Sequence, residues 1–180
     1  MVEFTVIVPA RFASLRLPGK PLRDVAGKPL IQRTYETVKT SSATRIVVAT
    51  DDDGISQVVH GFGGEVCLTS VSHQSGTDRV AEAATSLELD ADEIVVNVQG
   101  DEPDMPGALI DQVVEALVAN PSASVATAAT GLDNPGQFID PAVVKVVTDK
   151  KNFALYFSRA GIPFARSDAE GGPDRVPWRL

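Results

Sequence analysis

Short runs of β-branched residues alternate along this chain with longer segments of helical periodicity. The β-branched runs predict strands at residues 4–8, 45–50, 65–69 and 93–98. The segments between and after them favour helices at residues 30–40, 54–62, 77–89 and 107–119. The strand runs are almost continuously apolar, which is typical of strands that are covered on both faces. The alternation therefore predicts an α/β fold, with a mainly parallel central sheet and helices on both of its faces.

The pattern of the second half of the chain is less regular. Apolar residues recur at helical spacing from Leu109 to Val118, and Asn120-Pro121 predicts the end of that helix. Two further strands are predicted at residues 124–130 and 143–148, and residues 153–158 suit either a helix or a strand. We expect residues 1–165 to form one domain. Residues 166–180 lack periodicity, and we expect them to form a loop that leads into a further, missing C-terminal segment.

The chain is acidic as a whole but basic near its N-terminus. Its 180 residues carry a formal net charge of −8 at pH 7, which argues against nucleic-acid binding. The basic residues of the first 28 positions are Arg11, Arg16, Lys20, Arg23 and Lys28. A local cationic site in an acidic protein suits a small anion such as a triphosphate, whereas the alternative is a solvated basic loop.

The composition is that of a soluble protein. No apolar stretch is long enough to span a membrane, and the N-terminus lacks the pattern of a signal peptide. We therefore expect a cytoplasmic protein without a membrane partner. The single cysteine, Cys67, excludes an internal disulfide and is expected to be a small buried side chain. The two histidines, His60 and His73, belong to no Cys/His cluster, which argues against a zinc site.

The residues after the first predicted strand favour phosphate binding. Pro9 is expected to end this strand, and in doubly wound sheets ligands bind at the carboxyl ends of the strands. The loop from Pro9 to Lys20 contains two arginines, a lysine, a serine and Gly19, which together offer charge, bidentate hydrogen bonding and close backbone approach. The spacings of the P-loop and of the dinucleotide fingerprint are both absent. The loop therefore predicts a nucleoside triphosphate site of another type.

A second loop carries a candidate metal ligand. Asp101 follows Gly100 after the strand predicted at 93–98. A carboxylate at this position can hold Mg²⁺ against substrate phosphates, or it can cap a turn near Pro103. Beside a phosphate-binding first loop, the metal interpretation is favoured.

Two other segments favour helix capping. Asp51, Asp52 and Asp53 precede the helix predicted from Gly54, where carboxylates cap amide groups, and we prefer this interpretation to a metal site. The segment that contains Ser75 and Thr77 opens another predicted helix. Its hydroxyl and amide groups either cap that helix or recognise the edge of a base.

Four segments, in this order, resemble the 3-deoxy-manno-octulosonate (KDO) cytidylyltransferases of Gram-negative bacteria. They are Pro9–Leu22, His73–Arg79, Val96–Pro103, and Tyr156–Ala160 with the following Ile162-Pro163. The resemblance extends over essentially the whole chain. Sialic-acid cytidylyltransferases share the architecture but carry a different first loop, so they match less well.

The resemblance implies a Rossmann-like nucleotidyltransferase fold, a homodimer and Mg²⁺ as cofactor. The implied enzyme makes CMP-KDO and pyrophosphate from CTP and KDO, for lipopolysaccharide synthesis. Its implied catalytic residues are Arg11, Lys20 and Asp101, and Asp101 is also the implied Mg²⁺ ligand.

Further residues are implied to bind the substrates. In chain order they are Pro9, Ala10, Ser14, Arg16, Gln74, Ser75, Gly76, Arg79, Gln99 and Arg159. The residues of the first loop would hold the triphosphate, and those between 74 and 79 would surround the nucleotide. Gln99 and Arg159 would face the sugar acid.

Members of this family continue beyond the segments quoted above. They have a strand region with His and Tyr that helps to bind the sugar and contributes to dimer contacts, and a second Mg²⁺-binding Asp. The residues present here therefore predict nucleotide binding better than turnover. Two alternatives stay open: a nucleotidyltransferase for another sugar or sugar acid, and a non-catalytic nucleotide-binding module.

Overall fold

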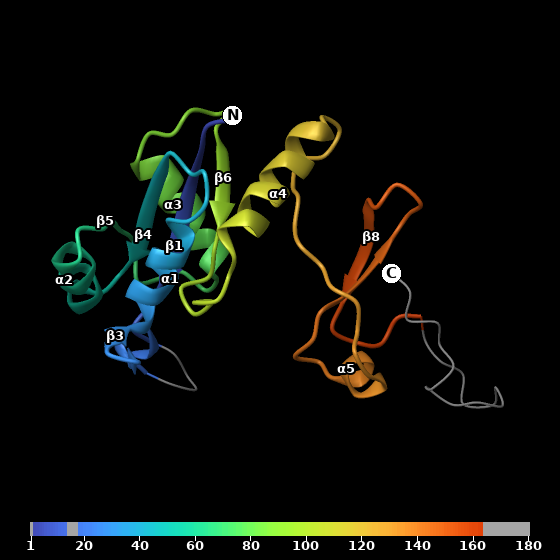
Figure 1. Ribbon diagram of the computed structural model, residues 1–180, viewed down its shortest axis with the longest axis horizontal. Coiled ribbons are helices and arrows are strands. Elements are labelled where there is room, and N and C mark those ends of the chain that lie inside the picture. The colour runs from blue at the N-terminus through green and yellow to red at the C-terminus, as the bar shows by residue number, and fades with distance from the viewer. Residues whose placement is uncertain (1, 14–17, 164–180) are drawn as a thin grey trace. The chain divides into compact units, whose positions relative to one another are not determined.

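The computed structural model describes residues 2–13 and 18–163. The chain divides into two compact units, Met1–Ala126 and Thr127–Leu180, and each is described by itself (Figure 1). The loop predicted at residues 166–180 lies outside the described residues. Among the described residues, no helix combines the length and the apolar character that crossing a bilayer requires.

The first unit contains a four-stranded parallel sheet in the order β5-β4-β1-β6. Its strands are β1 (Phe4–Ala10), β4 (Arg45–Thr50), β5 (Glu65–Leu68) and β6 (Ile94–Asn97). β1 is central and pairs with β4 on one side and with β6 on the other. Every residue of β1 is buried, as expected for a strand that is covered on both faces. The predicted parallel sheet is thus confirmed.

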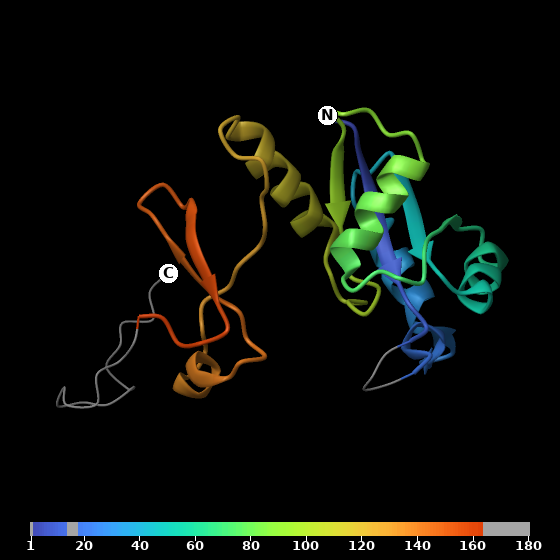
Figure 2. The same cartoon turned by 180° about the vertical axis from the view of Figure 1, so that it is seen from behind.

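Helices cover both faces of this sheet. They are α1 (Leu30–Val38), α2 (Asp53–Gly61), α3 (Gly76–Ser86) and α4 (Gly107–Ala119). Side chains at alternate positions of β1 point to opposite faces. Phe4, Val6 and Val8 pack with α1, α2 and α4, whereas Ile7 packs with α3 and with Cys67, which is buried as predicted. Figure 2, seen from behind, shows α3 in front of the sheet.

Between β1 and α1 lie a short 3₁₀ helix, η1 (Lys20–Leu22), and a small antiparallel ribbon of β2 (Asp24–Val25) and β3 (Lys28–Pro29). β1 also continues through Pro9, so the prediction that Pro9 ends the strand was wrong. The pairing of β1 with β6 ends where Ile7 lies opposite Asn97. The backbone groups of Pro9, like those of Ile7 two residues earlier, face the β6 side of β1. Because the pairing with β6 has already ended there, the N–H that proline lacks costs no hydrogen bond of the sheet.

The second unit contains α5 (Pro135–Ile139) and an antiparallel hairpin of β7 (Lys145–Thr148) and β8 (Ala154–Ser158). The segment at 153–158 is therefore a strand. The strand predicted at 124–130 is wrong, because these residues form no regular element and no described strand pairs with them. A β-rich sequence becomes a strand only where a neighbour satisfies its backbone groups.

A buried ion pair connects three elements of the first unit. Arg79 of α3 donates to the Asp51 carboxylate after β4 at 2.7 Å, and it also donates to the Thr69 hydroxyl after β5. The two charged side chains are only 3% and 13% exposed. The cap of α2 is Asp52, whose carboxylate accepts from Ile55 N at 2.8 Å. The capping prediction is thus confirmed for Asp52 and wrong for Asp51, which binds Arg79 instead.

We expect Asp51→Ala to lower the free energy of unfolding by about 3 kcal/mol, because it leaves a buried guanidinium without its carboxylate. Asp52→Ala, the matched control, removes only a helix cap and should cost about 1 kcal/mol. Denaturant unfolding of both variants measures the difference. Equal losses would contradict the assigned roles of the two carboxylates.

Gly100 follows β6 where the chain crosses the end of β1. A Cβ atom there would lie 2.9 Å from the carbonyl oxygen of Pro9 and 3.3 Å from Ile31 Cδ1. We expect Gly100→Ala to destabilise the protein by about 1–3 kcal/mol, since backbone would have to move. Gly61→Ala is the control, because a Cβ atom at Gly61 meets nothing within 4 Å. A Gly100→Ala variant as stable as Gly61→Ala would rule out this close contact.

Candidate active site

The loops that follow β1 and β6 meet at the carboxyl edge of the sheet. Lys20 Nζ donates to Asp101 Oδ2 at 2.5 Å, so the predicted phosphate-binding loop and the predicted metal ligand lie side by side. The lysine and aspartate side chains are 38% and 50% exposed. Both groups are therefore accessible to a ligand in solution.

Local backbone structure places Lys20 at this edge. Gly19 has a φ of 67° and its N–H donates to the carbonyl of Phe12 at 3.0 Å, which closes the base of the loop. A Cβ atom on Gly19 would lie 3.1 Å from the Phe12 ring, so the loop closes tightly here. Arg11 is exposed on the first arm of the loop. Ser14 and Arg16 lie outside the described residues.

Helix α1 holds the turn that carries Asp101. The hydroxyl of Thr34 donates to Gly100 O at 3.0 Å, and that of Thr37 donates to Pro103 O at 2.7 Å. Loss of hydration, and then the charge of Asp101, raise the pKa of the neighbouring Glu102. A cation bound at Asp101 would reduce the repulsion between these two carboxylates.

The carboxylate of Asp101 suits Mg²⁺ better than zinc. Among the described residues, no three His, Cys, Asp or Glu side chains are grouped closely enough to hold a metal ion together. Mg²⁺ is commonly bound by one or two carboxylates, with waters and substrate phosphates as its other ligands. A single half-exposed carboxylate beside the predicted phosphate-binding loop fits that donor set.

The N-terminus of α3 lies beside the same edge. A Cβ atom on Gly76 would lie 3.2 Å from Gln99 Oε1 and 3.4 Å from Pro9 Cγ. Three of the predicted segments therefore converge within the first unit. The side-chain amide of Gln99 donates to Asn97 Oδ1 at 3.0 Å, and Gln74 donates to Ser72 O at 3.4 Å.

Ser75 caps α3. Its Oγ accepts from Asp78 N at 3.1 Å and donates to Asp78 Oδ2 at 2.7 Å, and its own N–H donates to the same carboxylate. The capping interpretation is therefore confirmed for Ser75, and the hydroxyl is engaged. The guanidinium of Arg79 is engaged as well, and its predicted contact with the nucleotide stays a prediction.

The pairing of His73 with Glu82 was not foreseen from the sequence. His73 Nε2 contacts Glu82 Oε2, and the same carboxylate accepts from Ser70 N at 2.9 Å. The hydrogen bond with His73, and then that from Ser70, lower the pKa of Glu82. These contacts fasten the loop before Ser75 to α3. Two residues nine positions apart across a helix start form no sequence pattern that would have revealed the pair.

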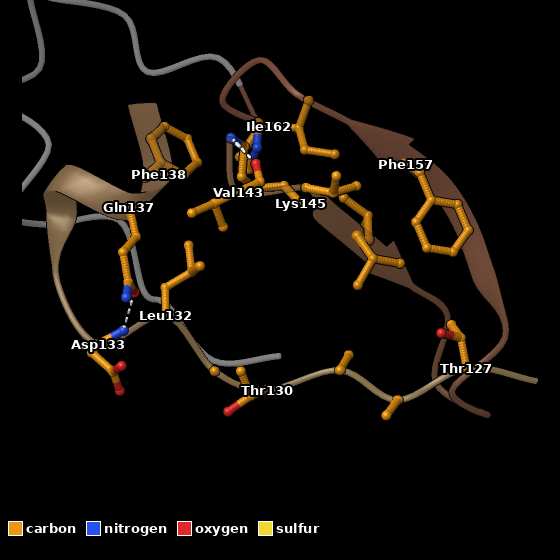
Figure 3. Close-up of a pocket in the computed structure, with 17 residues that line it drawn as sticks. Thr127, Thr130, Leu132, Asp133, Gln137, Phe138, Val143, Lys145, Phe157 and Ile162 are labelled. Atoms are coloured by element: carbon orange, nitrogen blue, oxygen red, sulfur yellow. Dashed lines mark hydrogen bonds between the residues drawn. The ribbon is translucent and has the colours of Figure 1, made fainter. Parts of the chain in front are cut away.

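The second unit contains Arg159 and an apolar cavity. Arg159 is exposed, and its Nη1 donates to Pro141 O at 2.8 Å. The cavity has a volume of about 660 Å³, and its walls include Leu132, Phe138 and Phe157 (Figure 3). Lys145, a cation in this wall, directs its ammonium to three backbone carbonyls. The cavity thus lacks the polar character that a triphosphate needs.

Comparison with known proteins identifies the family. Residues 5–171 match a family model described as cytidylyltransferase. The 3-deoxy-manno-octulosonate cytidylyltransferase of Hahella chejuensis is 54% identical over 175 residues, which cover 96% of this chain and 69% of that protein. That of Vibrio cholerae serotype O1 (strain M66-2) is 52% identical over 167 residues, which cover 93% and 66%. The chain spans about two thirds of the length of these relatives.

Solved structures of cytidylyltransferases have a similar fold. A CMP:2-keto-3-deoxy-manno-octonic acid synthetase complexed with CTP has a TM-score of 0.84 and 39% identity, over 93% of this chain and 68% of that chain. A cytidylyltransferase of Leptospira borgpetersenii has a TM-score of 0.56 and 26% identity, over 67% and 50%. These similarities and the parallel sheet confirm the predicted α/β nucleotidyltransferase fold. The chain belongs to the 3-deoxy-manno-octulosonate cytidylyltransferase family of nucleotidyltransferases.

Proposed function

We propose that this protein transfers a cytidylyl group from CTP to KDO and releases pyrophosphate. The observation that carries the proposal is the meeting of Lys20 and Asp101 at the carboxyl edge of the sheet. The similarity to a synthetase complexed with CTP supports the choice of nucleotide. The names of the relatives support KDO as the acceptor.

The reaction brings two anions together. The anomeric hydroxyl of KDO loses its proton to water as its oxygen attacks the α-phosphorus of CTP, and the bond from this phosphorus to the bridging oxygen of the pyrophosphate breaks. Catalysis then depends on holding both reactants in line and on offsetting their charge. In our proposal Arg11, Arg16 and Lys20 neutralise the triphosphate. Ser14, Pro9 and Ala10 would bind the same substrate.

Lys20 would exchange partners when the nucleotide binds. Its pair with Asp101 is more than one third exposed, and such pairs contribute only about 0–1 kcal/mol. Opening the pair therefore costs little. It frees the ammonium for a phosphate and the carboxylate for a cation.

Asp101 would hold Mg²⁺, which when bound neutralises charge on the triphosphate. Helix α1 fastens the backbone of the turn on either side of Asp101, through Gly100 O and Pro103 O, and so holds this residue beside the loop. Because the backbone of this turn is held in place, Asp101 needs little reorganisation to bind the cation.

The start of α3 would receive the nucleotide. The hydroxyl of Ser75 is used by the cap, so the amide groups of Gly76 and Thr77 remain as donors at this helix start. Among the described residues, no acceptor is paired with either amide. Gln74 and Arg79 complete the proposed nucleotide site, and Gln99 and Arg159 would face the sugar acid.

We further propose that the enzyme is a cytoplasmic homodimer whose product enters lipopolysaccharide synthesis. Membership of the family supports these assignments. Analytical ultracentrifugation of the purified protein tests the dimer, with a sedimenting mass of twice the chain as the expected result.

We expect Lys20→Ala to reduce kcat/KM for CTP by about 10²–10³, the usual effect of losing one preorganised charged contact. Lys28→Ala is the matched control, because Lys28 pairs with Glu36 at 2.7 Å within the same basic segment. Steady-state pyrophosphate release measures both variants. An unchanged kcat/KM for Lys20→Ala would refute its assignment.

We expect Asp101→Asn to weaken activation by Mg²⁺ while the fold stays intact, because the amide preserves volume but removes the charge that a cation needs. Asp104→Asn, in the same loop and exposed, should leave the Mg²⁺ titration unchanged. Calorimetric titration of Mg²⁺ in the presence of CTP gives a second readout besides activity. Normal Mg²⁺ affinity in Asp101→Asn would place the metal elsewhere.

A further inference from the structure

Lys145, the first residue of β7, is a buried cation. It is 5% exposed. Its Nζ donates to the backbone carbonyls of Asp140 at 2.7 Å, Val143 at 2.6 Å and Arg159 at 2.7 Å. Within the described residues, no carboxylate forms an ion pair with it.

The three carbonyls saturate the ammonium. A lysine has three N–H donors and no acceptor, and a buried charge is tolerated only when its donors are satisfied. Lys145 therefore has no donor left for a substrate. Its ammonium instead holds the backbone at Asp140, Val143 and Arg159 together.

Packing alone does not require a lysine at this position. Figure 3 shows Lys145 in the wall of the apolar cavity, beside Val143 and near Ile162. A methionine of similar length would suit such surroundings at lower desolvation cost. The presence of a charged lysine here is therefore explained by its hydrogen bonds to three backbone carbonyls.

One of these points is Arg159. In the hairpin Lys145 lies opposite Ser158, so the next residue, Arg159, comes within reach of the ammonium. The guanidinium of Arg159 also donates to Pro141 O at 2.8 Å, in the same 140–143 loop that Lys145 binds. Arg159 is thus fixed at its backbone by Lys145 and at its side chain by the loop.

The chain after Arg159 is fixed as well. A Cβ atom on Gly161 would lie 2.6 Å from Phe138 Cε1, so this residue packs directly on the ring of α5. Arg159 remains exposed, and among the described residues no carboxylate pairs with it. One N–H of its guanidinium is used by Pro141, which leaves the others for a planar, bidentate partner.

We propose that Lys145 is a positioning residue, which orients Arg159 to receive the carboxylate of the sugar acid. This inference rests on the proposed function, and within it adds a determinant of acceptor binding. Lys145 makes no contact with the substrate, and its effect reaches the acceptor only through Arg159.

The test uses the full-length protein, CTP, KDO and Mg²⁺. Lys145→Met should raise KM for KDO on the order of ten- to a hundredfold, as loss of a supporting contact typically does. KM for CTP should stay unchanged. Lys151→Met, an exposed lysine in the turn of the same hairpin, is the matched control and should change neither constant.

A double-mutant cycle with Arg159→Ala separates positioning from a general structural role. In the Arg159→Ala background, Lys145→Met should raise KM for KDO no further. Additive effects, or equal changes in both KM values, would overturn the inference. If Lys145→Met does not fold, Lys145→Arg keeps the charge but not the geometry of three convergent donors, and it should raise KM for KDO selectively.

The wild-type protein distinguishes this inference from the proposed function. Wild-type protein that releases no pyrophosphate would overturn both. Active wild-type protein with an unchanged KM for KDO in the folded Lys145 variants would overturn the inference alone.

Discussion

The close contact between Gly100 and the end of β1 determines the geometry of the first unit's site. The chain that leaves β6 passes so near to Pro9 O that a side chain would not fit. As a result Asp101 emerges beside the loop that carries Lys20, although the two residues are 81 positions apart. The hydroxyls of Thr34 and Thr37 on α1 then hydrogen-bond to this turn. The position of the Asp101 charge in the site depends on this backbone crossing.

Charged side chains are used in two ways in this protein. In the first unit Lys20 and Asp101 are partly exposed, so the pair can be exchanged for a phosphate and a cation at small cost. Arg79 with Asp51, and Lys145 with its carbonyls, are buried, and these charges hold the chain in place. Exposure therefore distinguishes the Lys20–Asp101 pair, which can open for a ligand, from the buried charges that hold the chain in place.

Much of the fold could be predicted, because periodicity and strand burial are local properties. The bounds of α4 agree with the prediction, since its apolar spacing and its stop signal are both explicit. Residues 124–130 show the limit: their β-rich composition cannot reveal that no described strand lies beside them. Likewise three consecutive aspartates look equivalent in sequence, and only the fold makes Asp52 the cap and Asp51 the partner of Arg79. The role of Lys145 could not be predicted from the sequence, because its partners are backbone carbonyls, which every residue type carries.

In the proposed reaction, the edge formed by β1, β6 and α3 binds CTP for transfer of its cytidylyl group to an acidic sugar. The most direct measurement follows CTP labelled at its α-phosphate, incubated with KDO, Mg²⁺ and the purified full-length protein. We expect the label to move into CMP-KDO as pyrophosphate appears in equal amount, and ATP, GTP or UTP in place of CTP to give far less product. The absence of a labelled sugar nucleotide, or equal transfer from all four triphosphates, would contradict the proposed reaction.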